Sequence, residues 1–345
     1  MASSTASRLG APRLGASRLG SDDVDLATRV AWLYYEGGLT QSEVSRNLGI
    51  PQARVQRLIA RALRDGLVRI SIEGPLSGCL ALERRMTEAY GLGFCRVVPA
   101  MPDDATGLSA LGGAAADYLH EAFASGRHRI IGVGHGRTLA AAIERLRAGN
   151  FTETTVVSVL GDVPHRVGAN PFDVIHALAD KTKASAYLPP VPFYANTPAD
   201  RDMLFRQRGV AEAFRLAAQA GFFVLGIGEV SEAAFLCRSG MILAEEIATV
   251  ARDGGVGELL GMFVDTSGRR VETELHERVI ALDPEIMRGR EALAVAGGAH
   301  KAAAIGAALN SGLISALVTD EPAARRLVET ASEDSVPAQI KATAS

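Results

Sequence analysis

Residues 130–142, IIGVGHGRTLAAA, join an apolar run, a loop with glycines and the start of an alanine-rich helix. A strand that leads through glycines into a helix leaves backbone N–H groups free at the helix N-terminus, where anions bind. The segment therefore predicts an anion-binding turn of an α/β sheet. By itself it does not distinguish an enzyme, a nucleotide-binding protein and a sensor of a phosphorylated molecule.

The same alternation of strand and helix continues from about residue 94 to about residue 330. Alanine-rich segments with a helical pattern lie between many apolar runs, which predicts a mostly parallel, doubly wound α/β sheet covered on both faces. The expected strands are CRVV (95–98), RIIGVG (129–134), TVVSVLG (155–161), SAYLP (185–189), FFVLGIG (222–228), ELLGMFV (258–264), RVIAL (278–282), ALAVAGG (292–298) and ISALVTD (314–320).

Four of these runs end in loops of similar composition: HGRT, EVSE, DTSG and AHK. Because ligands of doubly wound folds bind at the carboxyl ends of strands, we expect Thr138, Asp265 and Lys301 at one rim. A hydroxyl, a lysine and a helix N-terminus suit a phosphate monoester, and a nearby aspartate accepts hydrogen bonds from sugar hydroxyls.

Several enzyme and cofactor signatures are missing from the sequence. Arg137 stands where the third glycine of a dinucleotide loop belongs, and no Walker A, G-x-S-x-G or H-E-x-x-H motif occurs. We therefore predict no catalytic residue, no metal and no cofactor other than a small-molecule effector. A pair such as Asp265 and Lys301 is nevertheless able to move a proton at a sugar carbon, which leaves an isomerase-like enzyme as the alternative.

A basic module precedes the α/β region. Residues 1–74 carry ten arginines and seven acids, a net charge of +3, whereas the remaining residues carry −6. Thr40 and Glu43 form a capping-box pattern at the start of a short helix that ends at Gly49, and Pro51 opens the next helix. Two short helices joined by a glycine turn are typical of a helix-turn-helix, and LVRISIEG (67–74) predicts a β-wing.

The helix after Pro51 has two distinct faces. Val55, Leu58, Ile59 and Ala62 follow a helical period and should pack inward. Glutamine and arginine side chains on the opposite face suit base edges and phosphates in the major groove of DNA. A solvated face of a protein-binding hairpin is the alternative. The candidate DNA-contact residues are Thr40, Gln41, Ser42, Gln52, Ala53, Arg54, Gln56, Arg57 and Arg61.

These patterns divide the chain into five segments. We expect a disordered arm at 1–21, a winged helix-turn-helix at 22–74, a linker helix or dimer contact at 75–92, an effector-binding α/β domain at 93–335 and a tail at 336–345. The sequence contains no membrane span or signal peptide, and Cys79, Cys95 and Cys237 show no metal or disulfide spacing. A cytoplasmic protein is the expectation.

The sequence resembles the SorC family of bacterial transcriptional regulators. The resemblance covers about residues 25–330 and is carried, in the family's order, by LTQSEVSRNLGIPQARVQRLIARALRDGLVRI (39–70), GVGHGRTL (132–139), ALADKTKASAYLPP (177–190), VLGIG (224–228), GGVGELLGMFVDTSG (254–268) and AVAGGAHKAAAIGAALNSGLISALVTDE (294–321).

The resemblance implies a winged helix-turn-helix followed by a domain similar to ribose-5-phosphate isomerase and glucosamine-6-phosphate deaminase. It further implies a homo-oligomer, dimeric or tetrameric, whose affinity for operator DNA changes when a sugar, polyol or sugar phosphate binds. The effector contacts it implies are Gly134, His135, Gly136, Arg137, Thr138, Gly226, Gly228, Asp265 and Lys301.

Two positions depart from the family. His135 stands where tryptophan is common, and Pro51-Gln52 replaces the usual Ser-Arg at the start of the recognition helix. We expect the loop around Gly136, and with it the segment PVPFYANTP (190–198), to close over the effector. The alternative is a sugar-phosphate isomerase or deaminase with an N-terminal interaction module.

Overall fold

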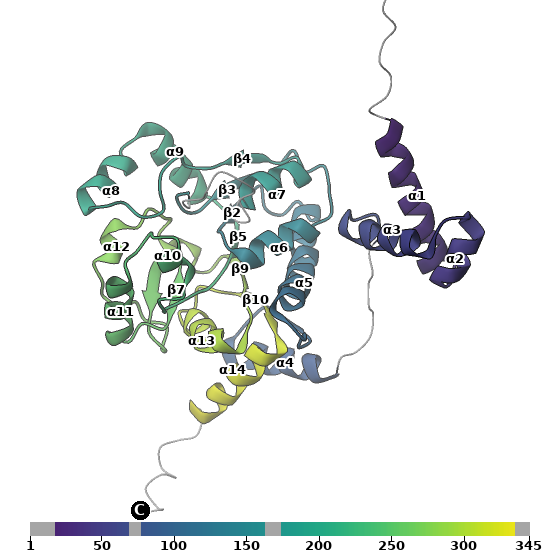
Figure 1. Ribbon diagram of the computed structural model, residues 1–345. Helices are drawn as coiled ribbons and strands as arrows, with labels where there is room; N and C mark the ends of the chain where they lie inside the picture. Colours follow the sequence, from purple (N-terminus) through teal and green to yellow (C-terminus); the bar gives the residue numbers. More distant parts are fainter. Residues whose placement is uncertain (1–17, 69–76, 163–173, 335–345) are drawn as a thin grey trace, which may run out of the picture. The chain divides into compact units, whose positions relative to one another are not determined.

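The computed structural model describes residues 18–68, 77–162 and 174–334. The chain divides into two compact units, Met1–Gly74 and Pro75–Ser345 (Figure 1). The first unit is helical and the second is built on a parallel sheet. The two units are described one after the other.

Within its described residues, 18–68, the N-terminal unit contains three helices, α1 (Arg18–Tyr35), α2 (Gln41–Leu48) and α3 (Gln52–Arg64). Thr40 caps α2 as predicted: its hydroxyl accepts a hydrogen bond from the Glu43 N–H, and the Glu43 carboxylate accepts one from the Thr40 N–H. Gly49 ends α2 with φ of 63°, a conformation that glycine adopts without strain. The predicted helix-turn-helix is therefore confirmed.

Two sequence expectations for this unit, the N-terminal arm and the wing, fall mostly outside the described residues. Helix α1 begins at Arg18, so the end of the segment expected as an arm is helical. An interior glycine costs a helix only about 1 kcal/mol, and the RLG repeat gave no helical period that would reveal this start. The rest of the arm, residues 1–17, and most of the expected wing, residues 69–74, lie outside the described residues.

The α/β unit has a seven-stranded sheet in which every paired strand is parallel, which confirms the predicted sheet. In spatial order the strands are β1 (Phe94–Val98), β10 (Ala316–Asp320), β9 (Glu291–Val295), β5 (Phe222–Leu225), β2 (Ile130–Val133), β3 (Thr155–Ser158) and β4 (Ser185–Tyr187).

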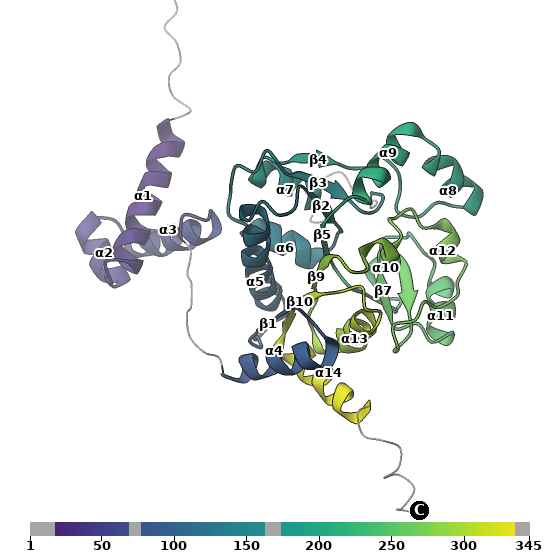
Figure 2. The same cartoon turned by 180° about the vertical axis from the view of Figure 1, so that it is seen from behind.

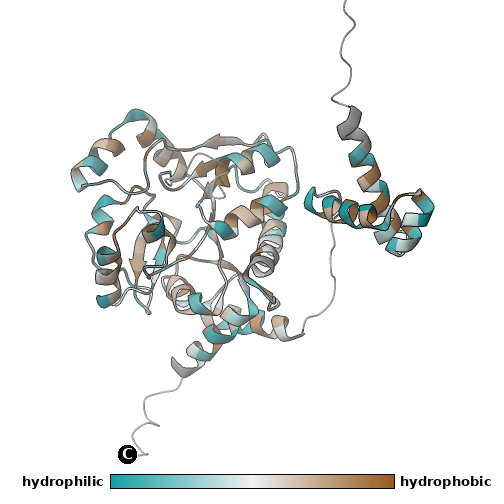
Figure 3. Ribbon diagram, in the orientation of Figure 1, coloured by the Kyte–Doolittle hydropathy of each residue, from teal (hydrophilic) through white to brown (hydrophobic). Residues whose placement is uncertain are grey.

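Helices cover both faces of this sheet. One buried cluster joins strand residues such as Ile131 to α5 (Asp104–Ala124), α6 (Arg137–Arg145) and α7 (Val174–Thr182). In Figure 3 the helices carry both hydrophilic and hydrophobic residues. The other cluster joins residues such as Phe223 to the helices of the opposite face, which are α4 (Ser77–Tyr90), α9 (Arg208–Ala217), α13 (Ala302–Asn310) and α14 (Glu321–Asp334).

Helix α4 belongs to the α/β unit and is not a linker. Its residues Cys79, Leu82 and Met86 are buried in the core, and the Tyr90 hydroxyl donates a hydrogen bond to the carbonyl of Leu327 in α14. Helices α4 and α14 lie side by side in Figures 1 and 2. The expectation of a linker was wrong because an amphipathic pattern shows that a face is buried but not what buries it.

Two expected strands have other structures. ELLGMFV forms a hairpin of β7 (Gly257–Leu259) and β8 (Met262–Val264), with Leu260 and Gly261 at φ of 53° and 80° in the turn. This hairpin pairs with β6 (Gly228–Glu229) in a separate small sheet. RVIAL makes only isolated bridges. An apolar run alone does not distinguish a strand from a hairpin or an irregular buried segment.

The order of the strands determines where a ligand fits. From β2 the chain proceeds outward to β3 and β4, and then returns to place β5 on the other side of β2. The loops after β2 and β5 therefore lead away in opposite directions, which opens a crevice at the carboxyl ends of these two strands. The short helices α8 (Pro198–Phe205), α10 (Phe235–Arg238), α11 (Ala244–Arg252) and α12 (Leu275–Arg278) and two 3₁₀ turns, Pro284–Met287 and Ala299–Lys301, complete the described part of this unit.

Candidate functional site

A cavity of about 580 Å³ lies at the carboxyl edge of the large sheet. Its walls come from the loops after β1, β2, β5, β9 and β10 and from the segment around α10. All but one of the predicted effector contacts line it, namely Gly134, His135, Gly136, Arg137, Thr138, Gly226, Gly228 and Lys301.

The loop after β2 brings a helix N-terminus to this cavity. Gly136 precedes α6 with φ of 130°, and no side chain caps the first turn of the helix. The first backbone N–H groups of a helix have no partner inside it, so they are available to an anion. The Thr138 hydroxyl donates a hydrogen bond of 2.8 Å to the Val295 carbonyl, which ties α6 to the end of β9 and leaves the oxygen of the hydroxyl able to accept.

Lys301 supplies a partly buried ammonium group. It follows β9 in a short 3₁₀ turn, and its Nζ donates to the Ile227 carbonyl at 3.1 Å. Burial lowers the pKa of Lys301, whereas Glu229 and Glu258 raise it and Arg137 lowers it further. The ammonium thus lies among carboxylates that sequence analysis did not identify as part of the site.

Glu258 is a half-buried carboxylate whose charge acts on Lys301. It lies in β7 and accepts a hydrogen bond of 2.5 Å from the Gly261 N–H. Burial raises the pKa of Glu258, while the hydrogen bond from Gly261 and the charge of Lys301 lower it. A Cβ atom on Gly228 would lie 2.2 Å from the carboxylate, so the missing side chain at that position is what admits Glu258.

His135 faces the cavity from an aromatic setting. Its ring lies 5.5 Å from that of Phe193 and 5.6 Å from that of Phe235. Its Nδ1 is buried and has no hydrogen-bond partner among the described residues. Burial lowers the pKa of His135 to about 4, so the imidazole is neutral near pH 7.

Asp265 does not belong to this cavity, contrary to expectation. Its carboxylate caps the turn after β8, where Oδ1 accepts from the N–H groups of Ser267 and Arg269 at 2.9 and 3.0 Å. The Ser267 hydroxyl also donates to Oδ1. This hydrogen bond first, and then those from the two N–H groups, lower the pKa of Asp265. The expectation was wrong because β8 belongs to the small antiparallel sheet, so its end lies elsewhere than the ends of the parallel strands.

The segment 190–198 is not a lid. Phe193 and Tyr194 are only 1% and 7% exposed, and bridges join Pro192 to Asp162 and Tyr194 to Val279. The structure instead places α10 beside the cavity, where Phe235 and Arg238 line it. An apolar, proline-rich segment reads equally well as a loop or as buried irregular chain, which explains the error.

Further polar residues that the sequence analysis missed also line the cavity: Asp103, Glu229, Arg238, His300 and Asp320. Asp320 ends β10 and accepts hydrogen bonds from Gly298 and Ala323. Its place at the end of a predicted strand was a usable signal. Asp103 and Arg238 lie in segments with no such signal.

The buried and exposed faces of α3 are those that its helical period predicts. Val55, Leu58, Ile59 and Ala62 are buried as expected, whereas Gln52, Ala53, Arg54, Gln56 and Arg57 are exposed. Before α3, Thr40 and Ser42 are exposed and Gln41 is half-buried.

The arginines of α3 differ in whether they form ion pairs. Arg61 pairs with Asp23 at 3.5 Å and with Asp65 at 3.0 Å, and Arg54 pairs with Asp23 at 3.6 Å. Arg57 makes no ion pair with any described residue. The Thr40 hydroxyl is likewise engaged, since it donates to the Glu43 carboxylate at 2.8 Å.

Two negative findings apply to residues 18–68, 77–162 and 174–334. No cluster of three or more histidine, cysteine, aspartate or glutamate side chains is placed to hold a metal ion. No helix there is long and apolar enough to span a membrane.

Comparison with known proteins agrees with both units. Residues 74–329 match the family model of a sugar-binding domain, and residues 30–65 match that of sigma-70 region 4. The erythritol catabolism regulatory protein EryD of Brucella abortus is 42% identical over 306 residues, which cover 89% of this chain and 97% of that protein. The transcriptional regulator LsrR of Klebsiella pneumoniae is 32% identical and covers 89% and 94%.

Solved structures show the same fold. The full-length sorbitol operon regulator SorC of Klebsiella pneumoniae superposes with a TM-score of 0.69 at 24% identity, covering 89% of this chain and 99% of that one. A helix-turn-helix joined to a sugar-binding α/β domain defines the chain as a DNA-binding transcriptional regulator of sugar metabolism. It belongs to the SorC family.

Proposed function

We propose that the cavity at the carboxyl edge binds a short acyclic polyol or its monophosphate, and that this ligand sets the affinity of α3 for operator DNA. The observation that carries the proposal is the convergence of five strand-end loops on one cavity with both cations and carboxylates. Because the relative EryD is named for erythritol catabolism, erythritol and its phosphate are the first compounds to test.

The charges of the cavity suit a ligand with two chemically different ends. Arg137, Lys301 and the N-terminus of α6 offer positive charge and N–H donors to an anionic group. Glu229 and Glu258 offer carboxylate oxygens to hydroxyl groups. With carboxylates and cations both present, the cavity suits a polyol or its monophosphate better than a ligand with several phosphates.

The DNA-contact residues follow from the exposed face of α3. We propose that Gln52, Gln56 and Arg57 reach base edges or phosphates in the major groove, with Ala53 and Arg54 beside them. Thr40, Gln41 and Ser42 then approach the phosphate backbone at the start of α2, and Arg61 acts less directly because Asp23 and Asp65 engage it. A palindromic operator calls for a homodimer or a tetramer, and the protein works in the cytoplasm.

We further propose that the chain performs no catalysis. The enzyme alternative named Asp265 and Lys301 as a pair able to move a proton at a sugar carbon, and Asp265 instead caps a turn outside the cavity. The ammonium of Lys301 also donates to a backbone carbonyl. Because fold does not fix function, a regulator can keep the fold of a sugar-phosphate enzyme and bind its ligand without turnover.

Operator binding measured by fluorescence anisotropy tests this proposal. The DNA is the region upstream of the protein's own gene, and erythritol, its monophosphate and a series of other polyols are titrated at fixed salt. By linkage, effector and DNA change each other's affinity by one factor, commonly about 5–150-fold. Selective change with one of these compounds supports the proposal. Binding that no compound alters, or steady isomerisation of a sugar phosphate, contradicts it.

A further inference from the structure

The turn after β9 brings Lys301 to the cavity, and its shape depends on Gly298. Within the turn, the Lys301 N–H donates to the Gly298 carbonyl at 2.9 Å, and the Lys301 ammonium donates to the Ile227 carbonyl at 3.1 Å. Gly298 has φ of 98°, a conformation that glycine adopts without strain. The position of the ammonium therefore depends on how Gly298 is held.

Asp320 holds Gly298 against the start of α14. Asp320 ends β10 and directly precedes α14, and its Oδ2 accepts a hydrogen bond of 2.6 Å from the Gly298 N–H. Its Oδ1 accepts one of 2.9 Å from the Ala323 N–H in the first turn of α14, as in a helix N-cap. A Cβ atom on Gly297 would lie 2.5 Å from Oδ2, so the missing side chain there is what permits this approach. One carboxylate thus joins the turn to the helix.

Arg326 makes a second link between α14 and the same turn. Its Nη1 donates to the Ala299 carbonyl at 3.1 Å, although the residue is exposed and lies outside the cavity. Asp320 does line the cavity, but each of its carboxylate oxygens already accepts a backbone N–H. Both residues therefore act on the backbone of the turn that carries Lys301.

We propose that Asp320 and Arg326 are positioning residues that hold the turn 298–301 on α14 and so place Lys301 for the effector. This inference rests on the proposed function, because it takes Lys301 as a contact of the polyol or polyol phosphate. Asp320 and Arg326 act through Lys301 and do not bind the ligand themselves. Residues that act through one shared partner have non-additive effects on binding, and an experiment detects this property directly.

A double-mutant cycle measured by isothermal titration calorimetry tests the assignment. Asp320→Asn keeps the size of the side chain but removes its charge and one acceptor, and Arg326→Met removes the guanidinium. Each change is made alone and together with Lys301→Met. Arg325→Met is the matched control, because Arg325 is the neighbouring exposed arginine of α14 and pairs with Glu321 of the same helix. The ligand is erythritol phosphate, or the polyol or polyol phosphate that the wild type binds best.

Asp320→Asn should weaken binding of this ligand roughly 10-fold and Arg326→Met roughly 3-fold, the ranges for a hydrogen bond to a charged group and for an exposed one. In the Lys301→Met background neither change should weaken binding further. Arg325→Met should bind as the wild type does. The direction of the effect of Asp320→Asn is informative, because removing a negative charge from the cavity would by itself strengthen binding of a phosphate.

Two outcomes overturn the inference. Unchanged or tighter binding by Asp320→Asn shows that its hold on the turn does not matter for the ligand. Losses that add fully to that of Lys301→Met indicate a direct contact or a general structural effect. Thermal unfolding and operator binding without effector show whether each variant is folded. If Asp320→Asn does not fold, Arg326→Met carries the same test, because it changes only an exposed side chain.

Failure of the proposed function gives a different result. A wild type that binds none of the polyols or polyol phosphates contradicts the proposed function, and this inference with it. That result is visible without any variant, whereas the double-mutant cycle fails only if the wild type binds and the variants do not behave as expected.

Discussion

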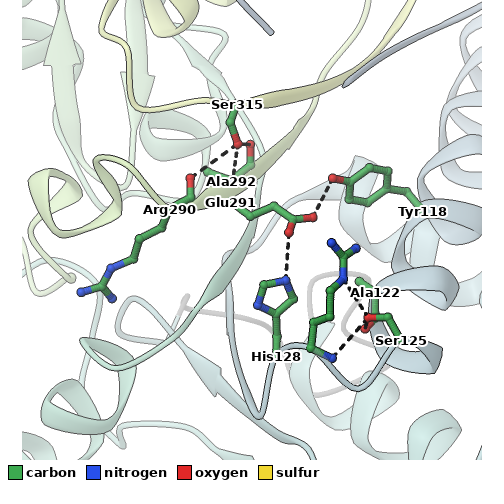
Figure 4. A network of polar contacts seen from close by, with 9 residues as sticks. Tyr118, Ala122, Ser125, His128, Arg290, Glu291, Ala292 and Ser315 are labelled. Atoms are coloured by element: carbon green, nitrogen blue, oxygen red, sulfur yellow. Dashed lines mark hydrogen bonds and ion pairs between the residues drawn. The ribbon is translucent and has the colours of Figure 1, made fainter. Parts of the chain in front are cut away.

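Glutamate and histidine side chains have different surroundings at the two edges of the large sheet. At the amino edge, Glu291 accepts a hydrogen bond of 2.7 Å from the Tyr118 hydroxyl, and its other carboxylate oxygen lies 2.8 Å from Nε2 of His128 (Figure 4). At the carboxyl edge, His135 has a buried nitrogen without a described partner, and Glu258 lines a cavity.

The difference assigns a stabilising role to the polar groups of the amino edge and a ligand-binding role to those of the carboxyl edge. A partly buried polar group that is fully paired joins the elements around it, as Glu291 joins β9 to α5 and to the segment before β2. A polar group that lines a cavity and keeps unused hydrogen-bonding capacity has its best partner in a ligand. Changes at the amino edge should therefore leave the effector response intact, whereas changes at the carboxyl edge should alter it.

The largest expected effect is on the stability of the protein at low pH. The pKa of His135 is about 4 in the folded protein, against about 6.5 for an unperturbed histidine. Between these values the unfolded chain binds more protons, so stability falls as the pH falls from about 6.5 to about 4, by up to about 3 kcal/mol. His135→Phe should remove this contribution, which urea unfolding at about pH 7 and about pH 4.5 measures.

A second histidine sets the background of that experiment. Burial also lowers the pKa of His276 to about 4, with a smaller contribution from Arg270, so His135→Phe should keep some loss of stability in acid. The prediction concerns the difference between wild type and variant. An identical loss in both proteins would show that His135 is not buried as a neutral group.

The next largest effect is on the effector. Lys301→Met removes the one lysine of the cavity, and the loss of a charged hydrogen bond should weaken binding of erythritol phosphate roughly 100-fold. Operator affinity without effector should stay as in the wild type. Calorimetry of the ligand and anisotropy of the DNA measure the two quantities separately.

Lys181→Met is the matched control. Like Lys301, Lys181 donates to backbone carbonyls, those of Glu144 and Leu146, but it does not line the cavity. It should bind erythritol phosphate as the wild type does. If both lysine variants lost the ligand equally, a general loss of positive charge would explain the result better than a contact in the cavity.

The contrast between the edges also shows what a sequence reveals. Apolar runs predicted nine strands, seven of which form the parallel sheet, and the loops after two of them bring Thr138 and Lys301 to the cavity because carboxyl ends of parallel strands meet at one edge. Asp265 was misplaced because a hairpin reads like a single strand. Glu258 was missed because it lies inside that same apolar run, where a lone acid carries no visible signal.

The amino-edge network left no pattern in the sequence at all. Glu291 is separated from Tyr118 by 173 positions and from His128 by 163. Only the spatial order of the strands, in which β9 and β2 flank β5, brings these residues together. Local periodicity describes one element at a time, so contacts between distant elements require the fold.

At the amino edge, Glu291→Ala should destabilise the protein by about 2 kcal/mol. The substitution leaves the Tyr118 hydroxyl and the His128 ring without their shared partner, and each unpaired group that is partly buried adds to the cost. Effector affinity, measured on the folded protein, should not change. Urea unfolding and calorimetry together decide between this result and a long-range effect on the cavity.

The smallest expected effect extends the contrast between paired and unpaired groups to the N-terminal unit. Arg57 is exposed and makes no ion pair with a described residue, whereas Arg61 pairs with Asp23 and Asp65. Arg57→Ala should therefore weaken operator binding about 10-fold, as for the loss of one base or phosphate contact, and Arg61→Ala should weaken it less. Anisotropy at fixed salt measures both, and unchanged effector binding shows that the α/β unit is intact. If Arg61→Ala had the larger effect, the ion pair of Arg61 with Asp23 of α1 would be needed to hold α3 in place. In that case ion-paired side chains would contribute to DNA recognition as well as to stability.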